Sequence, residues 1–153
     1  MYFLIKDNEI FGYQEPPSAD KSVIMVVATE NQNKNVEKYG LNYYKYYNGD
    51  IVYNENYEKE KEQKRRDYIN SLQCTKRVLA LALKEFGITY TRLKEVIATS
   101  EDAQLEWDLC VELQRSNPLL DTFGEILGIT PEQIDLIFLF ANGDVDSLEV
   151  NNE

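Results

Sequence analysis

A charged segment at residues 55–67 separates two parts of this chain that differ in composition. Nine of the eleven tyrosines lie in residues 1–57, among short apolar runs and turn residues, a texture typical of β-strands. After the charged segment, apolar residues recur at the three- and four-residue spacings of amphipathic helices. This order predicts an α+β fold, with a small N-terminal antiparallel β-sheet, a long helix and a C-terminal helical bundle.

The same change in texture predicts the domain organisation. We expect a tyrosine-rich β lobe at residues 1–54, a charged helical connector at 55–76, an acidic helical bundle at 77–143 and an acidic tail at 144–153. A helix that continued from residue 55 to 86 would be about 48 Å long. Its charged first half has only Tyr57 to bury, so it is either a solvated stalk between two lobes or a face for a partner.

Turn signals in the first part predict a mostly antiparallel sheet of four or five strands. Residues 6–9 connect two apolar runs at hairpin length, and Asn48-Gly49 tolerates the positive φ of a tight hairpin turn. The proline pair Pro16-Pro17 predicts a break in the chain. The continuous apolar run at residues 23–27 predicts a fully buried strand.

Capping signals in the second part predict four helices after a helix stop at Gly87. One of them is expected to start after Ser100 and to end near Arg115, with Leu105, Leu109 and Leu113 along one apolar face. The N-caps expected for the other three are either Thr89 or Thr91, then Asn117 and Thr130.

Charge restricts the class of partner. The chain has 16 basic and 27 acidic residues, a net charge of −11, and the acidity is concentrated in residues 77–153, whose net charge is −10 against −1 for residues 1–76. Such a chain repels nucleic-acid phosphates and anionic membranes, so we expect neither as a direct partner. The longest apolar runs are also far shorter than the roughly 20 residues of a membrane span.

The absence of histidine argues against an enzyme. It removes the commonest general base near neutral pH, the commonest metal ligand and every Ser-His or Cys-His nucleophile. Paired helical carboxylates are an alternative source of acid–base chemistry or of Mg²⁺ and Ca²⁺ ligands, but no complete calcium-loop pattern is present. Cys74 and Cys110 are expected to be buried, reduced thiols. We therefore predict no catalytic residues, no cofactor and no metal.

The densest acidic cluster is the candidate partner-binding site. Its carboxylates are either an ordinary solvated helix face or a surface that holds a partner protein with a basic surface. Trp107, the single tryptophan, is either a core residue or an interface anchor. The candidate residues are Glu101, Asp102, Glu106, Trp107, Asp108, Glu112 and Arg115.

Two groups of motifs carry a family resemblance. The first comprises Phe3-x-Ile5, Glu9-Ile10-x-Gly12-Tyr13 and Tyr44-x-Tyr46-Tyr47-Asn48-Gly49-Asp50; the second comprises Thr75-Lys76-Arg77-Val78, Glu106-Trp107-Asp108 and Asn117-Pro118. With these motifs the chain resembles the short accessory proteins encoded among bacteriophage tail and tail-fibre genes. The resemblance implies a phage or prophage origin and a role in building or modulating a tail fibre, and it supplies no catalytic residue. Because the first residues show no signal-peptide pattern, we expect the protein to act in the cytoplasm of the host bacterium.

Two hypotheses follow from these features. The first is a non-enzymatic protein-binding or assembly accessory protein, possibly a tail-fibre assembly factor or chaperone. The second is a phage-encoded inhibitor that mimics nucleic acid and occupies the basic groove of a host defence protein, as inhibitors of CRISPR effectors do. Salt sensitivity separates them, because a mimic loses affinity steeply as ionic strength rises.

Overall fold

The structure is a computed structural model that describes residues 1–15, 20 and 22–148. It contains two compact units, Met1–Gln63 and Lys64–Glu153, whose boundary falls inside the segment 55–76. The predicted α+β class is confirmed, since an antiparallel sheet comes first and helices dominate the chain after it. The expected break at Pro16-Pro17 and the last five residues of the expected tail at 144–153 lie outside the described residues.

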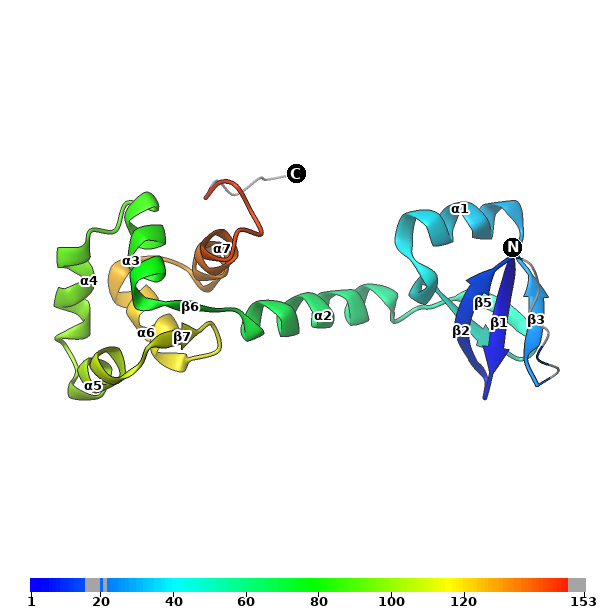
Figure 1. The fold of residues 1–153 in the computed structure, drawn as a ribbon, viewed down its shortest axis with the longest axis horizontal. Coiled ribbons are helices and arrows are strands. Elements are labelled where there is room, and N and C mark those ends of the chain that lie inside the picture. Colours follow the sequence, from blue (N-terminus) through cyan, green and yellow to red (C-terminus); the bar gives the residue numbers. More distant parts are fainter. Residues whose placement is uncertain (16–19, 21, 149–153) are drawn as a thin grey trace. The chain divides into compact units, whose positions relative to one another are not determined.

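The first unit is built on a three-stranded antiparallel sheet in the order β2-β1-β3, with a separate two-stranded hairpin, β4-β5 (Figure 1). All of the pairings are antiparallel, as predicted, but the strands form two sheets instead of one sheet of four or five strands. Its elements are β1 (Tyr2–Lys6), β2 (Glu9–Gln14), β3 (Ile24–Val27), α1 (Glu30–Tyr39), a 3-10 turn (Leu41–Tyr43), β4 (Tyr44–Tyr47) and β5 (Asp50–Tyr53).

Both predicted hairpin turns are confirmed. Asp7 and Asn8 connect β1 to β2 with φ of 53° and 63°, and Asn48 and Gly49 connect β4 to β5 with φ of 49° and 93°. Two consecutive positive φ values match the right-handed twist of the flanking strands, and Asn, Asp and Gly are the residues that adopt them most readily.

The core of the first unit lies on one face of its central strand. Phe3 and Ile5 of β1 are completely buried there and pack with Ala28 and with partly buried residues of α1, β4 and β5. The prediction of a fully buried strand at residues 23–27 is wrong. β3 is an edge strand that pairs only with β1 within the described residues, and Ile24, Met25 and Val27 are exposed.

The second unit consists of helices and one short two-stranded ladder (Figure 1). Helix α2 (Tyr57–Ser71) contains the boundary between the units, and residues 58–65 of it are exposed. Whether this part is a stalk or a binding face stays a prediction. The elements that follow are β6 (Gln73–Thr75), α3 (Lys76–Glu85), α4 (Tyr90–Ile97), α5 (Glu101–Leu109), β7 (Glu112–Gln114), α6 (Pro118–Leu127) and α7 (Pro131–Ala141).

Helix α2 does not continue to residue 86, the length considered from the sequence. Helix α2 ends at Ser71, because the next residues pair as strand β6 with β7, with Cys74 opposite Leu113. A new helix, α3, then starts where the Thr75 hydroxyl accepts a hydrogen bond from the backbone N–H of Val78. Both Cys74 and Leu113 are buried, so the β6-β7 ladder places these two side chains in the core. A continuous helix would have oriented them differently.

A single hydrophobic core unites the helices of the second unit. Val96 of α4 and Ile137 and Phe138 of α7 are its most deeply buried side chains. The predicted caps are confirmed, since the side chains of Thr89, Ser100, Asn117 and Thr130 each accept a hydrogen bond from a first-turn backbone N–H. The caps satisfy donors that have no partner within the helix and so define where each helix begins.

Candidate interaction surface

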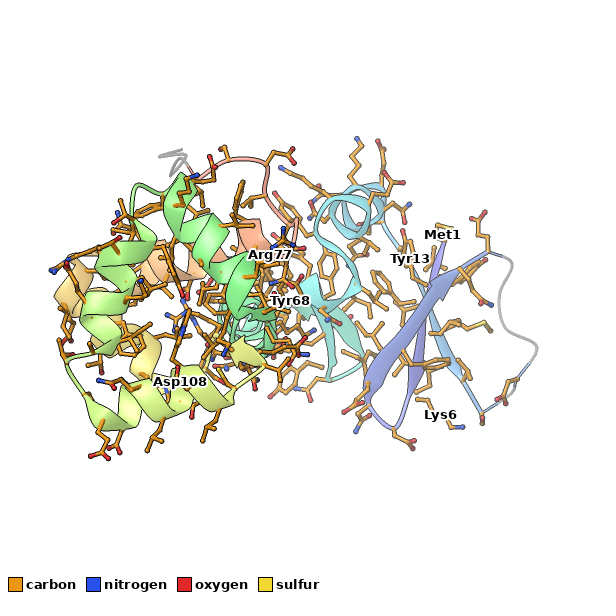
Figure 2. The ribbon with its side chains drawn as sticks, turned by 60° about the vertical axis from the view of Figure 1, so that its left-hand side comes forward. Met1, Lys6, Tyr13, Tyr68, Arg77 and Asp108 are labelled. Carbon is orange, nitrogen blue, oxygen red and sulfur yellow. The ribbon has the colours of Figure 1, made fainter. Side chains whose placement is uncertain are left out.

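Helix α5 carries most of the predicted partner-binding residues. It starts at the Ser100 cap, and Glu101 and Asp102 occupy its first turn, where negative charge is favourable. Ala103 is buried and Trp107, one turn later, is half-buried, so these two residues define the side of α5 that faces the core. Figure 2 labels Asp108 on this helix.

All five predicted carboxylates are exposed on α5 and the start of β7. Of the five, Glu106 also accepts a hydrogen bond from the Asn117 side chain, at 2.9 Å. The five exposed carboxylates are those of Glu101, Asp102, Glu106, Asp108 and Glu112.

Three large aliphatic side chains are exposed among these carboxylates. Leu105 and Leu109 on α5 are 51% and 79% exposed, and Val111, between α5 and β7, is 78% exposed. The prediction that Leu105, Leu109 and Leu113 share one face of a helix extending to Arg115 is wrong. The helix ends at Leu109, and only Leu113, which lies in β7, is buried.

A tertiary contact accounts for the early end of α5. The Lys76 ammonium, at the start of α3, donates hydrogen bonds to the backbone carbonyl oxygens of Trp107, at 2.6 Å, and Asp108, at 3.4 Å. These carbonyls belong to the last turn, where no helical N–H is available to them. Cys110 is extended, and β7 follows two residues later. A residue distant in sequence therefore stabilises the end of the helix.

Arg115 is the one predicted partner-binding residue that the structure places in the interior. It is 5% exposed, and its Nε donates to the Asp135 carboxylate at 2.6 Å. Its guanidinium also binds the Pro131 carbonyl oxygen and the carboxylate of Asp121, while Arg66 binds the second oxygen of Asp135. Arg115 therefore joins β7 to α6 and α7 and is not available to a partner.

Trp107 has features of both predicted alternatives, a core residue and an exposed interface anchor. The indole packs against the core of the second unit, yet the residue is only half-buried, and the Lys76 ammonium lies 5.9 Å from the ring centroid. A half-buried tryptophan beside a charged group is held in place by its buried edge and still offers a face to a ligand.

The described residues contain neither a cluster of metal ligands nor a cysteine whose pKa is lowered. Across residues 1–15, 20 and 22–148, no group of three or more Cys, Asp or Glu side chains lies close enough to hold a metal ion. Both cysteines are free, as expected, and Cys74 is buried, whereas Cys110 is only half-buried. Burial raises the pKa of the Cys74 thiol to about 11 and also raises that of Cys110. Raised pKa values leave both thiols protonated and unreactive near neutral pH.

The first unit has an exposed apolar surface of its own, at the β3 edge. Val27 is 66% exposed, and Ile24 and Met25 are also exposed, whereas the exposed Phe11 lies on β2, at the opposite edge of the sheet. An unpaired strand edge that bears apolar side chains is a template for adding a strand from another protein. Residues 23–27 were predicted to be buried, so the sequence carried no signal of this exposed edge.

Neither unit contains a helix, in the part of the chain that is described, with the length and apolar character needed to cross a membrane. We find no match for this chain among protein-family models, curated proteins or solved structures, so its function has to be inferred from its own residues.

Proposed function

We propose that this protein is a non-enzymatic protein-binding protein and that it binds its partner through the surface of α5 and the residues leading into β7. The observation that carries the proposal is the exposure of Leu105, Leu109 and Val111 in a segment that also bears five exposed carboxylates. Exposed aliphatic side chains rimmed by charges are typical of protein interfaces.

The aliphatic residues supply the affinity in this proposal. Burying a fully exposed leucine or valine side chain contributes about 1.5–3 kcal/mol, and Leu109 and Val111 are both close to fully exposed. Two such side chains are enough to make the surface a binding hot spot when a partner covers them.

The carboxylates supply the choice of partner. Rim charges contribute to the rate of association and to specificity more than to affinity, and five carboxylates favour a protein with a basic surface. Residues 77–153 have a net charge of −10, so the long-range field of this part of the chain attracts the same class of partner.

The biological setting of the proposal rests on the resemblance to phage tail-associated accessory proteins. We propose a phage or prophage origin, action in the host bacterial cytoplasm, and a role as an assembly factor or chaperone for a tail fibre. The exposed β3 edge supports an assembly role, because strand addition to another protein needs such an edge.

The alternative is an inhibitor that places carboxylates where a host nuclease expects phosphates. The five exposed carboxylates of the α5 surface favour it, but it assigns no role to the exposed Leu109 and Val111. The two functions therefore differ in which residues they require.

Affinity capture with matched variants tests the proposal. The bait is the full chain, incubated with lysate of the native host with and without phage infection, and captured proteins are quantified by mass spectrometry across a salt series. Leu109→Ser is compared with Ile126→Ser, which removes another exposed aliphatic residue, and Glu112→Lys with Glu125→Lys.

We expect Leu109→Ser to lose a captured virion protein that Ile126→Ser retains, with a milder loss for Glu112→Lys. A nucleic-acid mimic gives the opposite pattern, since Leu109→Ser leaves capture unchanged while salt and Glu112→Lys abolish it. If neither variant differs from its control, the α5 surface is not the binding site and the proposal is wrong.

A further inference from the structure

The second unit contains an open groove whose charge is opposite to that of the rest of the unit. It runs along one face of α3 between the start of α4 and the end of α5, and its volume is about 600 Å³. Figure 2 labels Arg77 and Asp108, which lie in this groove. The lining residues are Lys76, Arg77, Ala80, Leu81, Lys84, Tyr90, Trp107 and Asp108.

The cations of the groove have no carboxylate partner among the described residues. Arg77 and Lys84 are both exposed and form no ion pair within this part of the chain, and Lys76 contacts the backbone carbonyls of α5 and the Trp107 ring. Three cations thus face one lining carboxylate, that of Asp108. A net positive groove in a strongly acidic unit is available for an anionic ligand.

The floor between the cations is apolar. Leu81 and Tyr90 are 50% and 52% exposed, and Trp107 contributes its half-buried indole. Lys94 lies 5.0 Å from the Tyr90 ring centroid, which brings a further positive charge to the same ring. A ligand that matches this floor needs apolar side chains as well as negative charge.

The spacing along α3 defines the ligand more closely. Arg77 and Lys84 are seven residues apart, about 10.5 Å along the axis, with Ala80 and Leu81 between them. A single phosphate or carboxylate reaches only one end of this stripe. In an extended peptide, side chains four residues apart lie on one face about 13 Å apart, with the side chain between them on that same face. Long Arg and Lys side chains accommodate this span.

We propose that the groove of α3, α4 and α5 binds an extended acidic peptide segment of a partner protein, in which two carboxylates four residues apart flank an apolar side chain. The carboxylates pair with Arg77 and Lys84, and the apolar side chain covers Leu81 and the rings of Tyr90 and Trp107. This second surface selects the opposite charge to the α5 surface, so it does not depend on the function proposed above.

A nucleic-acid strand fits the groove less well. Its phosphates would have to continue past the groove over a unit that carries exposed carboxylates on α5 and β7. A short acidic segment places its charges only where the cations are.

The groove can be tested with a synthetic peptide, because Trp107 is the single tryptophan and lines the groove. The probe is the acetylated peptide Gly-Glu-Ser-Leu-Ser-Glu-Gly, titrated into the full chain while tryptophan fluorescence is recorded. Two control peptides replace both glutamates with glutamine, or the leucine with serine. A thymidine oligonucleotide is titrated separately.

Arg77→Glu and Lys84→Gln test the cations, and Leu81→Ser tests the floor. Arg92→Glu is the matched control, because Arg92 is exposed on α4, pairs with Glu95 and does not line the groove. Unchanged thermal unfolding of each variant verifies that the fold is retained.

We expect the glutamate peptide to bind the unaltered chain, and each groove variant and each control peptide to weaken binding about tenfold. Arg92→Glu should change binding less than twofold. The proposal is overturned if Arg92→Glu weakens binding as much as Arg77→Glu, if the glutamine peptide binds equally well, or if the oligonucleotide binds and the peptide does not.

Discussion

The two units of this protein are held together in different ways. Among the described residues of the second unit, sixteen buried hydrophobic residues form one core. In the described part of the first unit, the corresponding cluster contains three buried residues, Phe3, Ile5 and Ala28, and its remaining members are partly buried.

Tyrosine side chains supplement the small core of the first unit. Tyr43 packs against the rings of Tyr39, Tyr44, Tyr53 and Tyr57, with centroid separations of 4.7 to 5.2 Å. Tyrosine hydroxyls also donate hydrogen bonds between segments of this unit, from Tyr57 to the Tyr39 carbonyl oxygen and from Tyr13 to the Asn33 side chain. An aromatic ring packs while its hydroxyl remains hydrated or bonded, so a small unit can be stabilised without complete burial.

The difference predicts that the first unit is the less stable of the two. A small β unit buries a low fraction of its surface and has little stability to lose, whereas a larger helical core tolerates single losses. The unfolding of the two units can be followed separately by tyrosine and tryptophan signals. Nine of the eleven tyrosines lie in residues 1–57, and Trp107 lies in the second unit.

Truncating the main core phenylalanine of each unit is the strongest test. Phe3 and Phe138 are both 0% exposed, and replacing either with alanine costs about 3–5 kcal/mol. We expect Phe3→Ala to abolish the near-ultraviolet circular dichroism of the tyrosines while Trp107 fluorescence is unchanged. Phe138→Ala should lower the urea midpoint of the Trp107 transition without unfolding the second unit. The reverse outcome would refute the comparison.

Breaking the buried ion pair between Arg115 and Asp135 should destabilise the second unit nearly as much as truncating a core phenylalanine. Arg115→Met leaves the Asp135 carboxylate, 3% exposed, with Arg66 as its remaining ion-pair partner, and removing one member of a buried pair costs about 3–5 kcal/mol. Trp107-detected urea unfolding measures the loss. The double variant Arg115→Met/Asp135→Leu should recover part of it. The exposed pair offers a control, because Arg92→Met should cost less than about 1 kcal/mol.

Alkaline pH should weaken the second unit through Cys74. Burial raises the pKa of its thiol from 9.0 to about 11, so below pH 9 the thiol is protonated in both states and its contribution is constant. As pH rises from 9 to 11 the thiol ionises first in the unfolded chain, which lowers the free energy of unfolding by about 2–3 kcal/mol. Trp107-detected unfolding across this range should show the decrease. Cys74→Ala should remove it, and an equally steep decrease in that variant would assign it to other groups.

The smallest expected loss of stability comes from a substitution of Gly124 in α6. A Cβ atom at this position would lie 2.6 Å from the Ile134 Cδ1 and 3.0 Å from the Ile129 carbonyl oxygen. Gly124→Ala should therefore destabilise the second unit by about 1–2 kcal/mol, although alanine favours helices by about 1 kcal/mol over glycine. Ile134→Val removes the Cδ1 atom, so the double variant should cost less than the sum of the two changes. Additive costs in thermal unfolding would show that the contact is not the cause.

Local sequence signals were sufficient to predict the hairpin turns and most of the helix starts. Asn48-Gly49 was recognisable because the backbone preference belongs to the two turn residues themselves. Thr130-Pro131 was recognisable for the same reason, since a cap and a first-turn proline act within one turn of the chain.

The errors occurred where a distant partner decides the structure. Residues 23–27 are as apolar as a central strand, but β3 lies at an edge because no described strand pairs with its outer side. Helix α2 ends at Ser71 because β6 pairs with β7, about forty residues further along the chain. Neither outcome is encoded in the local pattern of apolar residues.

For the candidate binding surfaces too, prediction from the sequence fails where residues distant in the chain decide the structure. The carboxylates of α5 were predictable as exposed, because unpaired charges are rarely buried. Arg115 was predicted to bind a partner together with these carboxylates, yet it lies in the interior, where Asp135 and Asp121 compensate its charge. The groove lined by Arg77, Lys84 and Tyr90 had no sequence signal, since its residues come from three helices.

The sequence alone determined the α+β class, both hairpin turns, most of the helix caps and the concentration of negative charge in the second part of the chain, because each of these depends on composition or on residues within one turn of one another. The tertiary structure decided the rest: which apolar residues are buried and which are left exposed, where α2 and α5 end, and where three cations gather in an acidic unit. These outcomes depend on contacts between segments far apart in sequence, whose free energies exceed the local preferences of the residues concerned.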